Sequence, residues 1–190
     1  MKTALLAAAC VIAVAGCASS PSSTSRAPAA TPQAPAVSTA KSARVVLAPA
    51  SGSLVSGTLN LVPTADGVRI AGEIGGLTAG GTHAIHIHET GDCSAADASS
   101  AGGHFNPGNE PHGRAGTPTH HGGDMDNLSA NGEGVAQASV EARGVTLGGG
   151  AANDVAGRAV VVHAKADDYT SQPSGNAGDR VACGVIEITG

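Results

Sequence analysis

Histidines carry most of the chemistry that this sequence offers, and all eight lie between positions 83 and 163. His86 and His88 stand two residues apart, so in a β-strand their imidazoles project from the same face and can reach one metal ion. The pair alone also fits a solvated strand face, where polar side chains alternate in the same way. His83 would point to the opposite face, and we expect it to be a structural histidine. The remaining histidines are His104, His112, His120, His121 and His163.

A second candidate cluster lies in the segment 91–128, which is rich in Gly, His and Asp and almost free of aliphatic residues. Such a loop has no apolar packing against which to bury imidazoles, whereas a metal ion held by several of them would order it. Three imidazoles and one carboxylate suit Zn²⁺ in a closed structural site. A solvated loop that binds metals loosely is the alternative, but the wide spread of the donors favours a built site. The donors are His104, His112, His121 and Asp124.

His163 follows three valines at the end of an apolar run, where an imidazole without a partner would be costly to bury. The partner is either a hydrogen-bonding group or a metal ion, and the local sequence does not choose between them. Asp167, four residues further on, is a candidate acceptor that would hold neighbouring imidazoles in the tautomer that a metal requires. The alternative for Asp167 is an ordinary solvated turn carboxylate beside Asp168.

Short antiparallel β-strands are the elements predicted to position these side chains. From residue 44 to residue 190, apolar and polar residues alternate, and Gly, Asn, Asp and Pro interrupt the pattern. No stretch carries a 3.6-residue apolar stripe with helix caps, so the sequence favours a β-sandwich or barrel. The long loop 91–128 is the exception, and loops of that length in a compact domain usually have a function. We expect strands around residues 44–47, 55–61, 68–74, 85–88, 134–141, 158–164 and 181–189.

Composition limits the functions that are open to the chain. Its 190 residues suit one domain, or one domain with extensions. Phe105 and Tyr169 are the only aromatic residues, so a base-stacking platform is not expected. A net charge of −5 argues against general phosphate binding, and we expect no nucleic-acid partner. No apolar run reaches the roughly 18 residues that a membrane-spanning helix needs.

The N-terminus is predicted to be an export signal. Lys2 precedes an apolar stretch over residues 4–14, and Val-Ala-Gly-Cys at positions 14–17 resembles a bacterial lipobox. On this interpretation residues 1–16 are a lipoprotein signal peptide, and Cys17 is the lipidated first residue of the mature chain. The alternative is an ordinary secretory signal that is cleaved nearby.

Residues 17–43 are rich in Ser, Ala and Pro and have too little apolar area to offset the entropy of chain ordering. We therefore expect a disordered tether that joins the lipidated Cys17 to a folded domain of residues 44–190. An exported lipoprotein of this kind would lie in the periplasm, anchored to the outer or the inner membrane.

Two cysteines remain when the signal peptide is removed and Cys17 carries lipid, namely Cys93 and Cys183. In an oxidising compartment such a pair most economically forms one disulfide. A bridge between them would close a loop of about ninety residues and stabilise the fold by roughly 4 to 5 kcal/mol in the chain-entropy model. Copper coordination by free thiols is the competing interpretation, which the wide separation of the two residues disfavours.

Five motifs in this chain together resemble the copper–zinc superoxide dismutase family. They occur in the family's order with compatible spacings, and the match covers essentially the whole predicted domain. The motifs are His-Ile-His-Glu at 86–89 with Gly-Asp-Cys at 91–93, Gly-Gly-His-Phe-Asn-Pro at 102–107, His-Gly-Gly-Asp at 121–124, Val-Val-His-Ala-Lys-Ala-Asp-Asp at 161–168, and Gly-Asn-Ala-Gly-Asp-Arg-Val-Ala-Cys-Gly-Val-Ile at 175–186. With the export signal, the type implied is a bacterial, exported lipoprotein. The fold implied is a Greek-key antiparallel β-sandwich, or flattened barrel, of about eight strands with long metal-binding loops.

The resemblance also assigns the candidate ligands to two metal ions, one copper and one zinc in each subunit. Copper would be held by His86, His88, His104 and His163. Zinc would be held by His104, His112, His121 and Asp124. The imidazole of His104 would therefore bridge the two ions, and Asp167 would link a copper histidine to a zinc histidine. Cys93–Cys183 would be the disulfide of the fold.

The implied activity is the dismutation of superoxide to O₂ and H₂O₂, which would protect the cell envelope. In the family, copper oxidises one superoxide and reduces a second, which zinc cannot do because it has no second accessible oxidation state. The catalytic residues implied are His104, which takes up and delivers a proton, and Arg180, which attracts the anionic substrate beside copper. The expected partners are superoxide and, through the lipid anchor, a membrane. Relatives are dimers or monomers, so a homodimer is one expected arrangement.

Three local departures from the family pattern affect the expected rate. Gly103 stands where many relatives have Pro, so we expect a looser loop before His104. Asp179 places a negative charge beside Arg180, and residues 170–178 contain no charged side chain. We therefore expect activity below the family's highest rate. Steering of superoxide would depend on the remaining cations, Lys165, Arg114 and Arg180.

Two alternatives to an enzyme share the same fold. One is a non-catalytic periplasmic protein that binds copper and zinc, and the other is an inert structural or interaction module. Loss of a copper histidine or of Arg180 would favour either of them. This sequence keeps all of these residues, so the enzyme is the favoured interpretation.

Overall fold

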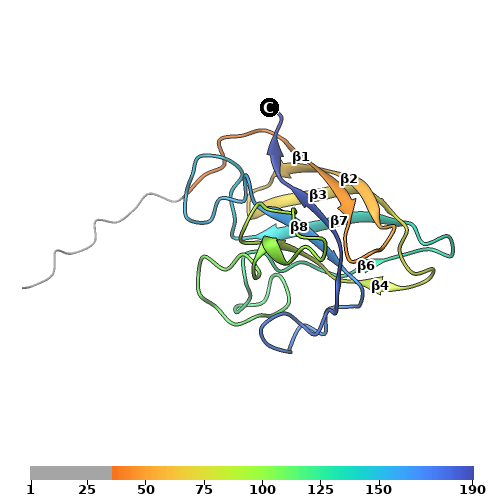
Figure 1. The fold of residues 1–190 in the computed structure, drawn as a ribbon. Helices are drawn as coiled ribbons and strands as arrows, with labels where there is room; N and C mark the ends of the chain where they lie inside the picture. Colours follow the sequence, from red (N-terminus) through yellow and green to blue (C-terminus); the bar gives the residue numbers. More distant parts are fainter. Residues whose placement is uncertain (1–35) are drawn as a thin grey trace, which may run out of the picture. The chain divides into compact units, whose positions relative to one another are not determined.

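The computed structural model describes residues 36–190, and nearly every regular element among them is a β-strand (Figure 1). The predicted signal peptide, Cys17 and most of the predicted tether lie outside the described residues. One 3₁₀ turn, η1 (Ser99–Ala101), is the only helical element in the described range. None of the elements within residues 36–190 is a helix of the length and apolarity that crossing a membrane requires.

Eight strands form one antiparallel sheet, and two short strands form another. The strands are β1 (Ala43–Pro49), β2 (Ser56–Pro63), β3 (Gly67–Gly75), β4 (Thr82–His83), β5 (Ile85–His88), β6 (Leu128–Ser129), β7 (Ala136–Arg143), β8 (Ala159–His163), β9 (Arg180–Val185) and β10 (Glu187–Ile188). The large sheet has the order β5-β8-β9-β1-β2-β3-β7, with β10 paired to β1, and β4 pairs with β6. Neighbours that are not consecutive in the chain, β3 with β7 and β1 with β9, mark the crossovers of a Greek key. The predicted all-β fold is thereby confirmed.

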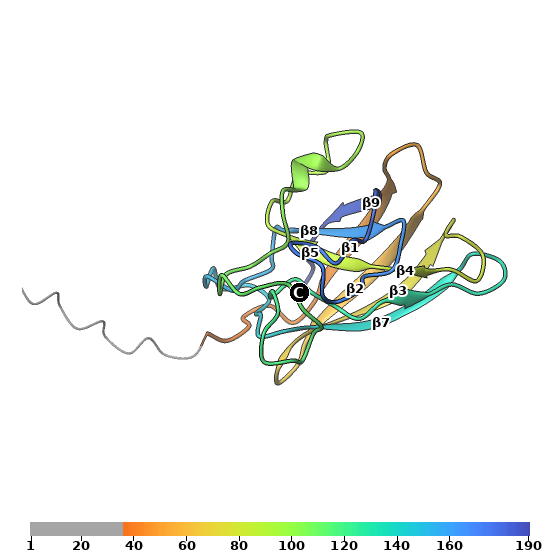
Figure 2. The ribbon, with the colours of Figure 1, turned by 90° about the horizontal axis from the view of Figure 1, so that it is seen from below.

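The sheet curls so that β8 and β9 lie opposite β3 and β7 across a core of aliphatic side chains (Figure 2). In β1 the core residues are Ala43, Val45 and Leu47, whereas Arg44 points outward. β7 repeats this alternation with small residues. Phe105, the only Phe of the chain, also lies in the core. Strands with one buried and one wet face produce the alternating pattern that the sequence shows.

Two strands depart from this alternation because both of their faces are buried. Every residue of β5 and of β8 is buried. The antiparallel register places Ile87 opposite Val160 and His86 opposite Val161. Ile87 and Val160 belong to the main core, whereas Val161 packs in a second cluster together with Ala101 of the long loop. The histidine face of β5 is therefore covered by that loop and kept from water.

Residues before the predicted start of the domain at position 44 make backbone contacts with it. The amides of Thr39 and Ala40 donate to the carbonyl of Leu147, at 3.1 and 3.0 Å. The amide of Leu147 donates in turn to Ser38 Oγ, at 2.9 Å. Backbone contacts of this kind need little apolar area, so an argument from composition placed these residues in the tether.

The predicted strands are found with shifted ends. The predicted strand 181–189 is divided into β9 and β10 by the buried Ile186, which belongs to the core. β4 and β6 were not predicted, because elements of two residues carry no periodicity. The predicted long loop contains only η1 before β6 begins at Leu128. This loop carries the rest of the candidate ligands.

Candidate metal centre

Four histidines bring their ring nitrogens to one point beside β5 and the end of β8. One donor atom from each residue lies within 4.8 Å of the others in this four-histidine cluster, which consists of His86, His88, His104 and His163. Because β5 and β8 are paired, three of the rings lie on one face of the sheet. His104 reaches them from the loop through an isolated β-bridge to His88. The structure brings together the four residues that the sequence analysis assigned to copper.

A second cluster, here called the aspartate cluster, consists of His104, His112, His121 and Asp124. Asp124 Oδ1 lies 2.9 Å from the Nδ1 atom of His104, 3.0 Å from that of His112 and 3.3 Å from that of His121. Asp124 Oδ2 accepts hydrogen bonds from the amides of Gly113 and His121. These are the four residues assigned to zinc. All of them come from the long loop, and backbone amides hold the carboxylate in place.

Hydrogen bonds outside the four-histidine cluster determine which ring nitrogen faces inward. His88 Nδ1 lies 3.0 Å from the carbonyl of Gly102, and His163 Nδ1 lies 3.3 Å from the carbonyl of Gly178. Since a carbonyl only accepts, each ring donates its Nδ1–H outward and turns the lone pair of Nε2 inward. The two Nε2 atoms are 3.4 Å apart.

Two inward ring nitrogens have no hydrogen-bond partner among the described residues. His86 binds Asp167 through Nε2, which leaves Nδ1 buried and alone. His104 faces Asp124 through Nδ1, which leaves Nε2 buried and alone. Such atoms are costly to bury, and converging lone pairs repel one another. A cation removes both penalties, so the residues present fit a metal ion at this point.

Two residues join the clusters. His104 belongs to both, with Nδ1 in the aspartate cluster and Nε2 in the four-histidine cluster. Asp167 forms a second link, because Oδ2 accepts from His86 Nε2 at 2.8 Å and Oδ1 accepts from His112 Nε2 at 2.9 Å. Asn127 holds Asp167 by donating to its carbonyl and accepting from its amide. The sequence analysis missed Asn127, because nothing around it marks a side chain that pairs with distant backbone.

The pKa values of four buried imidazoles are shifted, three downward and that of His112 upward. Burial and the charges of neighbouring imidazoles lower the pKa of His88 to about 2 and that of His163 to about 3. Burial lowers the pKa of His104 to about 4, against the opposing effect of Asp124. Burial also acts to lower the pKa of His112, but hydrogen bonds to two carboxylates outweigh it and raise this pKa to about 9. Asp124 is buried, yet hydrogen bonds from its histidines hold its pKa well below the usual range.

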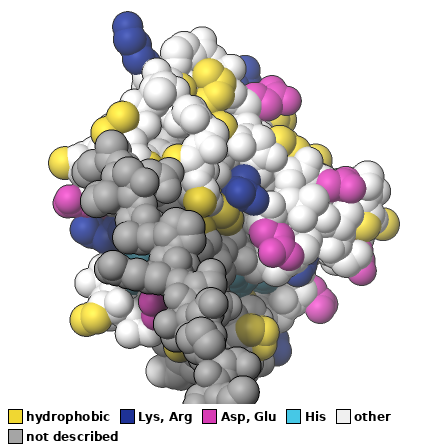
Figure 3. Space-filling view, turned by 90° about the vertical axis from the view of Figure 1, so that its left-hand side faces the viewer, with side chains coloured by type: hydrophobic (Ala, Val, Ile, Leu, Met, Phe, Trp, Pro, Cys, Tyr) yellow, Lys and Arg dark blue, Asp and Glu magenta, His cyan; other side chains and the backbone are white. Residues whose placement is uncertain are grey.

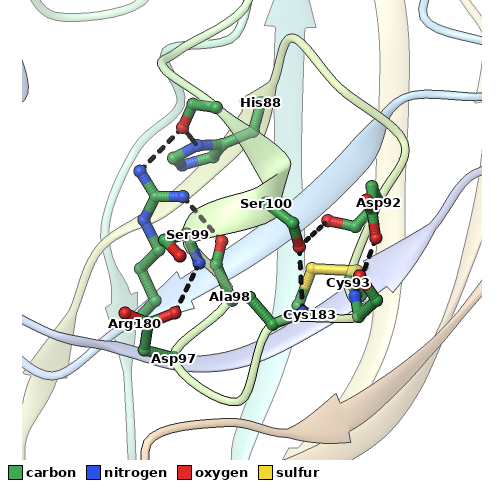
Figure 4. Close-up of a disulfide and its surroundings, with 12 residues drawn as sticks. His88, Asp92, Cys93, Asp97, Ala98, Ser99, Ser100, Arg180 and Cys183 are labelled. Atoms are coloured by element: carbon green, nitrogen blue, oxygen red, sulfur yellow. Dashed lines mark hydrogen bonds between the residues drawn. A yellow bond between two sulfur atoms is a disulfide. The ribbon is translucent and has the colours of Figure 1, made fainter.

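Arg180 lies in a surface pocket that leads to the four-histidine cluster and shares it with His88, His104 and His163. Its Nη1 donates to the carbonyl of Ala98 and its Nη2 to the carbonyl of Gly102, both at 2.7 Å (Figure 4). The carbonyl of Gly102 also accepts from His88. One loop carbonyl therefore orients both the guanidinium and a ring of the cluster.

The predicted disulfide between Cys93 and Cys183 is present (Figure 4). Cys183 lies in β9, three residues after Arg180, and Cys93 begins the loop segment that supplies the carbonyl of Ala98. Within that segment Ser100 Oγ donates to the carbonyl of Asp92. The disulfide therefore anchors the loop to β9, the strand that carries Arg180.

Both backbone groups of Gly103, in the loop before His104, are hydrogen bonded to Glu89. Gly103 donates its N–H to Glu89 Oε1 at 3.0 Å, and its carbonyl accepts from the amide of Glu89 at 2.9 Å. A proline at position 103 would have no amide to donate to Glu89. The expectation of a looser loop than in relatives stays a prediction.

Acidic and basic side chains are interspersed on the face shown in Figure 3. Arg114 pairs with Asp126 at 2.9 Å and lies over the ring of Tyr169, so its charge is partly neutralised. Lys165 forms no ion pair with any described residue, and its methylene groups lie beside Gly178, which lines the pocket. Lys165 is therefore the better placed of the two cations for steering.

Two histidines lie outside both clusters. His83 in β4 is buried, and its Nδ1 lies 3.0 Å from the carbonyl of His163. This contact matches the structural role expected for His83. The Nδ1 atom of His120 lies 2.7 Å from the carbonyl of His121, next to a cluster residue but facing its backbone.

The fold and the two clusters define an all-β metalloprotein whose paired metal sites share one histidine. The family model for copper/zinc superoxide dismutase (SODC) matches residues 55–186. This chain belongs to the copper/zinc superoxide dismutase family. It is accordingly an enzyme of the superoxide dismutase class, with copper and zinc as its cofactors.

Relatives of known name agree with this assignment. Superoxide dismutase (Cu-Zn) 1 of Aquifex aeolicus (strain VF5) is 41% identical over 134 residues, which cover 69% of this chain and 79% of the relative. The extracellular superoxide dismutase (Cu-Zn) of Brugia pahangi is 36% identical over 162 residues, covering 80% and 79%. Among solved structures, a double mutant of a SOD-like protein from Bacillus subtilis has a TM-score of 0.68 at 35% identity, covering 76% of this chain and 96% of its own. The clock protein EA4 has a TM-score of 0.69 at 36% identity, covering 81% and 98%.

Proposed function

We propose that this chain dismutates superoxide with copper in the four-histidine cluster and zinc in the aspartate cluster. The observation that carries this assignment is His104, whose Nδ1 faces the carboxylate of Asp124 while its buried Nε2 has no partner within residues 36–190. One imidazole can then serve two ions of different character. The overall reaction consumes two superoxide anions and two protons and yields one O₂ and one H₂O₂.

The four-histidine cluster suits a redox metal. Bound copper would supply the one-electron chemistry, because it alternates between two oxidation states. Imidazoles suit both states, so four of them allow cycling without a large rearrangement. Burial lowers the pKa values of His88 and His163, so these two rings are neutral at physiological pH. A neutral imidazole is the form that binds a metal.

Arg180 and His104 perform the substrate and proton steps in this proposal. Arg180 binds the superoxide anion in the pocket, where two carbonyls fix its guanidinium. Among the described residues no carboxylate forms an ion pair with it, and Asp97 acts on its charge only from a greater distance. His104 accepts and releases a proton at Nε2, the buried atom that has no hydrogen-bond partner among the described residues. Asp167 keeps His86 in the tautomer whose Nδ1 points inward.

The aspartate cluster suits a structural ion. Its four donors are buried, and three imidazoles with one carboxylate form a closed set for Zn²⁺. A zinc ion here would orient His104 and order a loop that has little apolar packing of its own. Asp124 supplies the negative charge that a divalent cation needs.

The direct test is the decay of a superoxide pulse in the presence of the purified protein loaded with one copper and one zinc. We expect rapid catalysed decay that disappears when copper is removed and in the His163→Ala variant. Full metal loading without catalysis would refute the enzyme assignment for this chain. It would instead favour the non-catalytic metal-binding protein of the same fold.

We further infer that the protein acts in the cell envelope as a lipoprotein and protects it from superoxide. Lys2, the apolar stretch over residues 4–14 and the lipobox ending at Cys17 support export. The Cys93–Cys183 disulfide suits an oxidising compartment. Labelling cells with a fatty-acid analogue should mark the wild type and not the Cys17→Ser variant. Label on that variant would refute lipidation at Cys17.

The oligomeric state is a separate expectation. Sedimentation of the purified protein would test the expected homodimer.

A further inference from the structure

The side chain of Gln172 pairs with the backbone of a candidate zinc ligand sixty residues away. Its Oε1 accepts from the amide of His112 at 2.9 Å, and its Nε2 donates to the carbonyl of His112 at 2.9 Å. The same Nε2 lies 3.3 Å from the carbonyl of Thr170. One amide side chain thus imitates a strand neighbour for a residue that belongs to no strand.

These two hydrogen bonds are the ones that satisfy the backbone of His112. Within residues 36–190 neither its N–H nor its C=O has another partner. His112 is only 4% exposed, so without Gln172 two backbone groups would be left unpaired in a largely buried place. Unpaired buried groups cost far more than a hydrogen bond contributes on average. Gln172 therefore holds the main chain from which this imidazole projects.

The other end of the contact belongs to the wall of the substrate pocket. Pro173 and Ser174 follow Gln172 directly and line the pocket that contains Arg180. The segment closes on itself, because the amide of Asp168 donates to the carbonyl of Gly175 at 3.0 Å. A displacement of His112 would therefore be transmitted to the pocket through a short and internally bonded turn.

Gly175 shows how closely this turn packs against the metal centre. A Cβ at this position would lie 1.8 Å from Asp167 Oδ1 and 2.7 Å from His112 Nε2. Its φ of +66° also favours glycine. The turn is thus fitted to Asp167, which links the clusters, and to His112 of the aspartate cluster. Gln172 is its contact with the backbone of His112.

We propose that Gln172 is a positioning residue that couples zinc binding at His112 to the order of the pocket wall at residues 170–178. The proposal rests on the proposed function only in taking His112 as a zinc ligand. Partners of metal ligands typically contribute 10- to 100-fold to metal affinity. By linkage, zinc that is held through His112 stabilises the turn bonded to it.

The test compares zinc release from the metal-loaded wild type, Gln172→Ala and Gln172→Glu to a chromophoric chelator. We expect Gln172→Ala to bind zinc about tenfold or more weakly. Gln172→Glu keeps the acceptor for the His112 amide but loses the donor to its carbonyl, so it should fall between the two. The matched control is Gln137→Ala in β7, which removes a side-chain hydrogen bond to Glu73 far from the clusters and should release zinc like the wild type.

Two further readouts separate this role from general stabilisation. Zinc should raise the Tm of the wild type by more than it raises the Tm of Gln172→Ala, whatever the difference in Tm between the two zinc-free proteins. Zinc should also slow amide hydrogen exchange over residues 170–178 in the wild type and much less in Gln172→Ala. Zinc affinity within twofold of the wild type, an equal loss of Tm with and without zinc, or equal slowing of exchange would each overturn the proposal.

The outcomes also distinguish this proposal from the proposed function. A wild type that binds zinc and dismutates superoxide, together with an unchanged Gln172→Ala variant, overturns the positioning role alone. A wild type that binds zinc but does not dismutate superoxide overturns the enzyme assignment, and the zinc measurements on the variants still decide the role of Gln172.

Discussion

The two clusters use the same residue type in opposite ways. Three rings of the four-histidine cluster project from the paired strands β5 and β8, whose backbones are bonded to each other. Every residue of the aspartate cluster projects from a loop, and a carboxylate, backbone amides and one glutamine side chain hold that loop in place. Burial lowers imidazole pKa values in the first cluster, whereas carboxylates raise that of His112 in the second.

This difference shows how one domain can combine a redox site and a structural site. A site built on strands keeps its geometry without an ion, because the hydrogen bonds of the sheet hold the backbone from which the ligands project. A site built on a loop needs its ion, its polar contacts and the disulfide, since it has no sheet hydrogen bonds and little apolar area to order it. His104 belongs to both clusters. A β-bridge to His88 and the contact of its Nδ1 atom with Asp124 position it.

The largest expected effect comes from removing one ring from each cluster. His88→Ala should abolish copper binding and reduce superoxide decay by at least about a thousandfold, because the redox centre is lost. His121→Ala should release zinc and lower the Tm of the protein while a copper signal persists. Metal content, pulse decay and calorimetry on both variants check this contrast. Equal loss of both metals in both variants would show that the clusters are not separable.

Removal of the disulfide should affect the loop more than the strands. Replacing Cys93 and Cys183 together by Ser should lower the free energy of unfolding by roughly 4 to 5 kcal/mol, because the 90-residue separation is no longer closed. Urea unfolding measures the total. Hydrogen exchange should rise first over residues 91–103 and last in β5 and β8, and a uniform rise would contradict the comparison.

Zinc and copper binding should differ in their dependence on pH. In the metal-free protein the pKa of His112 is raised to about 9, so at lower pH this ring is protonated and zinc must displace the proton. Zinc affinity should therefore rise about tenfold per pH unit from pH 6 to pH 8. The pKa values of His88, His104 and His163 in the four-histidine cluster are lowered, so these rings are already neutral and copper affinity should change little. Competition titrations at three pH values test this, and a flat zinc profile would count against it.

The smallest expected effect concerns steering. Lys165→Ala should lower kcat/KM at low salt by roughly twofold and weaken its salt dependence, because one unpaired cation beside the pocket is removed. Arg114→Ala should change the rate less, since Asp126 already offsets that charge. A wild-type rate at the diffusional ceiling would refute the expectation of a moderate rate, which was based on the uncharged segment 170–178.

Much of the strand-built part could be predicted from the sequence. Alternation located β1, β2, β3 and β5, and the two-residue spacing of His86 and His88 placed both rings on one face because a strand has a period of two. The motifs then identified the family, and with it the expected ligands. These signals are local, so a single chain displays them without any knowledge of what lies opposite.

By itself, the sequence determined the ligand types, their order along the chain, the all-β class and the pair of cysteines available for a bridge. Only the tertiary structure decided which nitrogen of each imidazole faces inward, because that depends on carbonyls such as those of Gly102 and Gly178. It alone revealed Asn127 and Gln172, and it showed hydrogen bonds to Leu147 from residues before 44. The physical reason is common to all of these: each depends on a hydrogen bond between distant segments, for which local periodicity carries no signal.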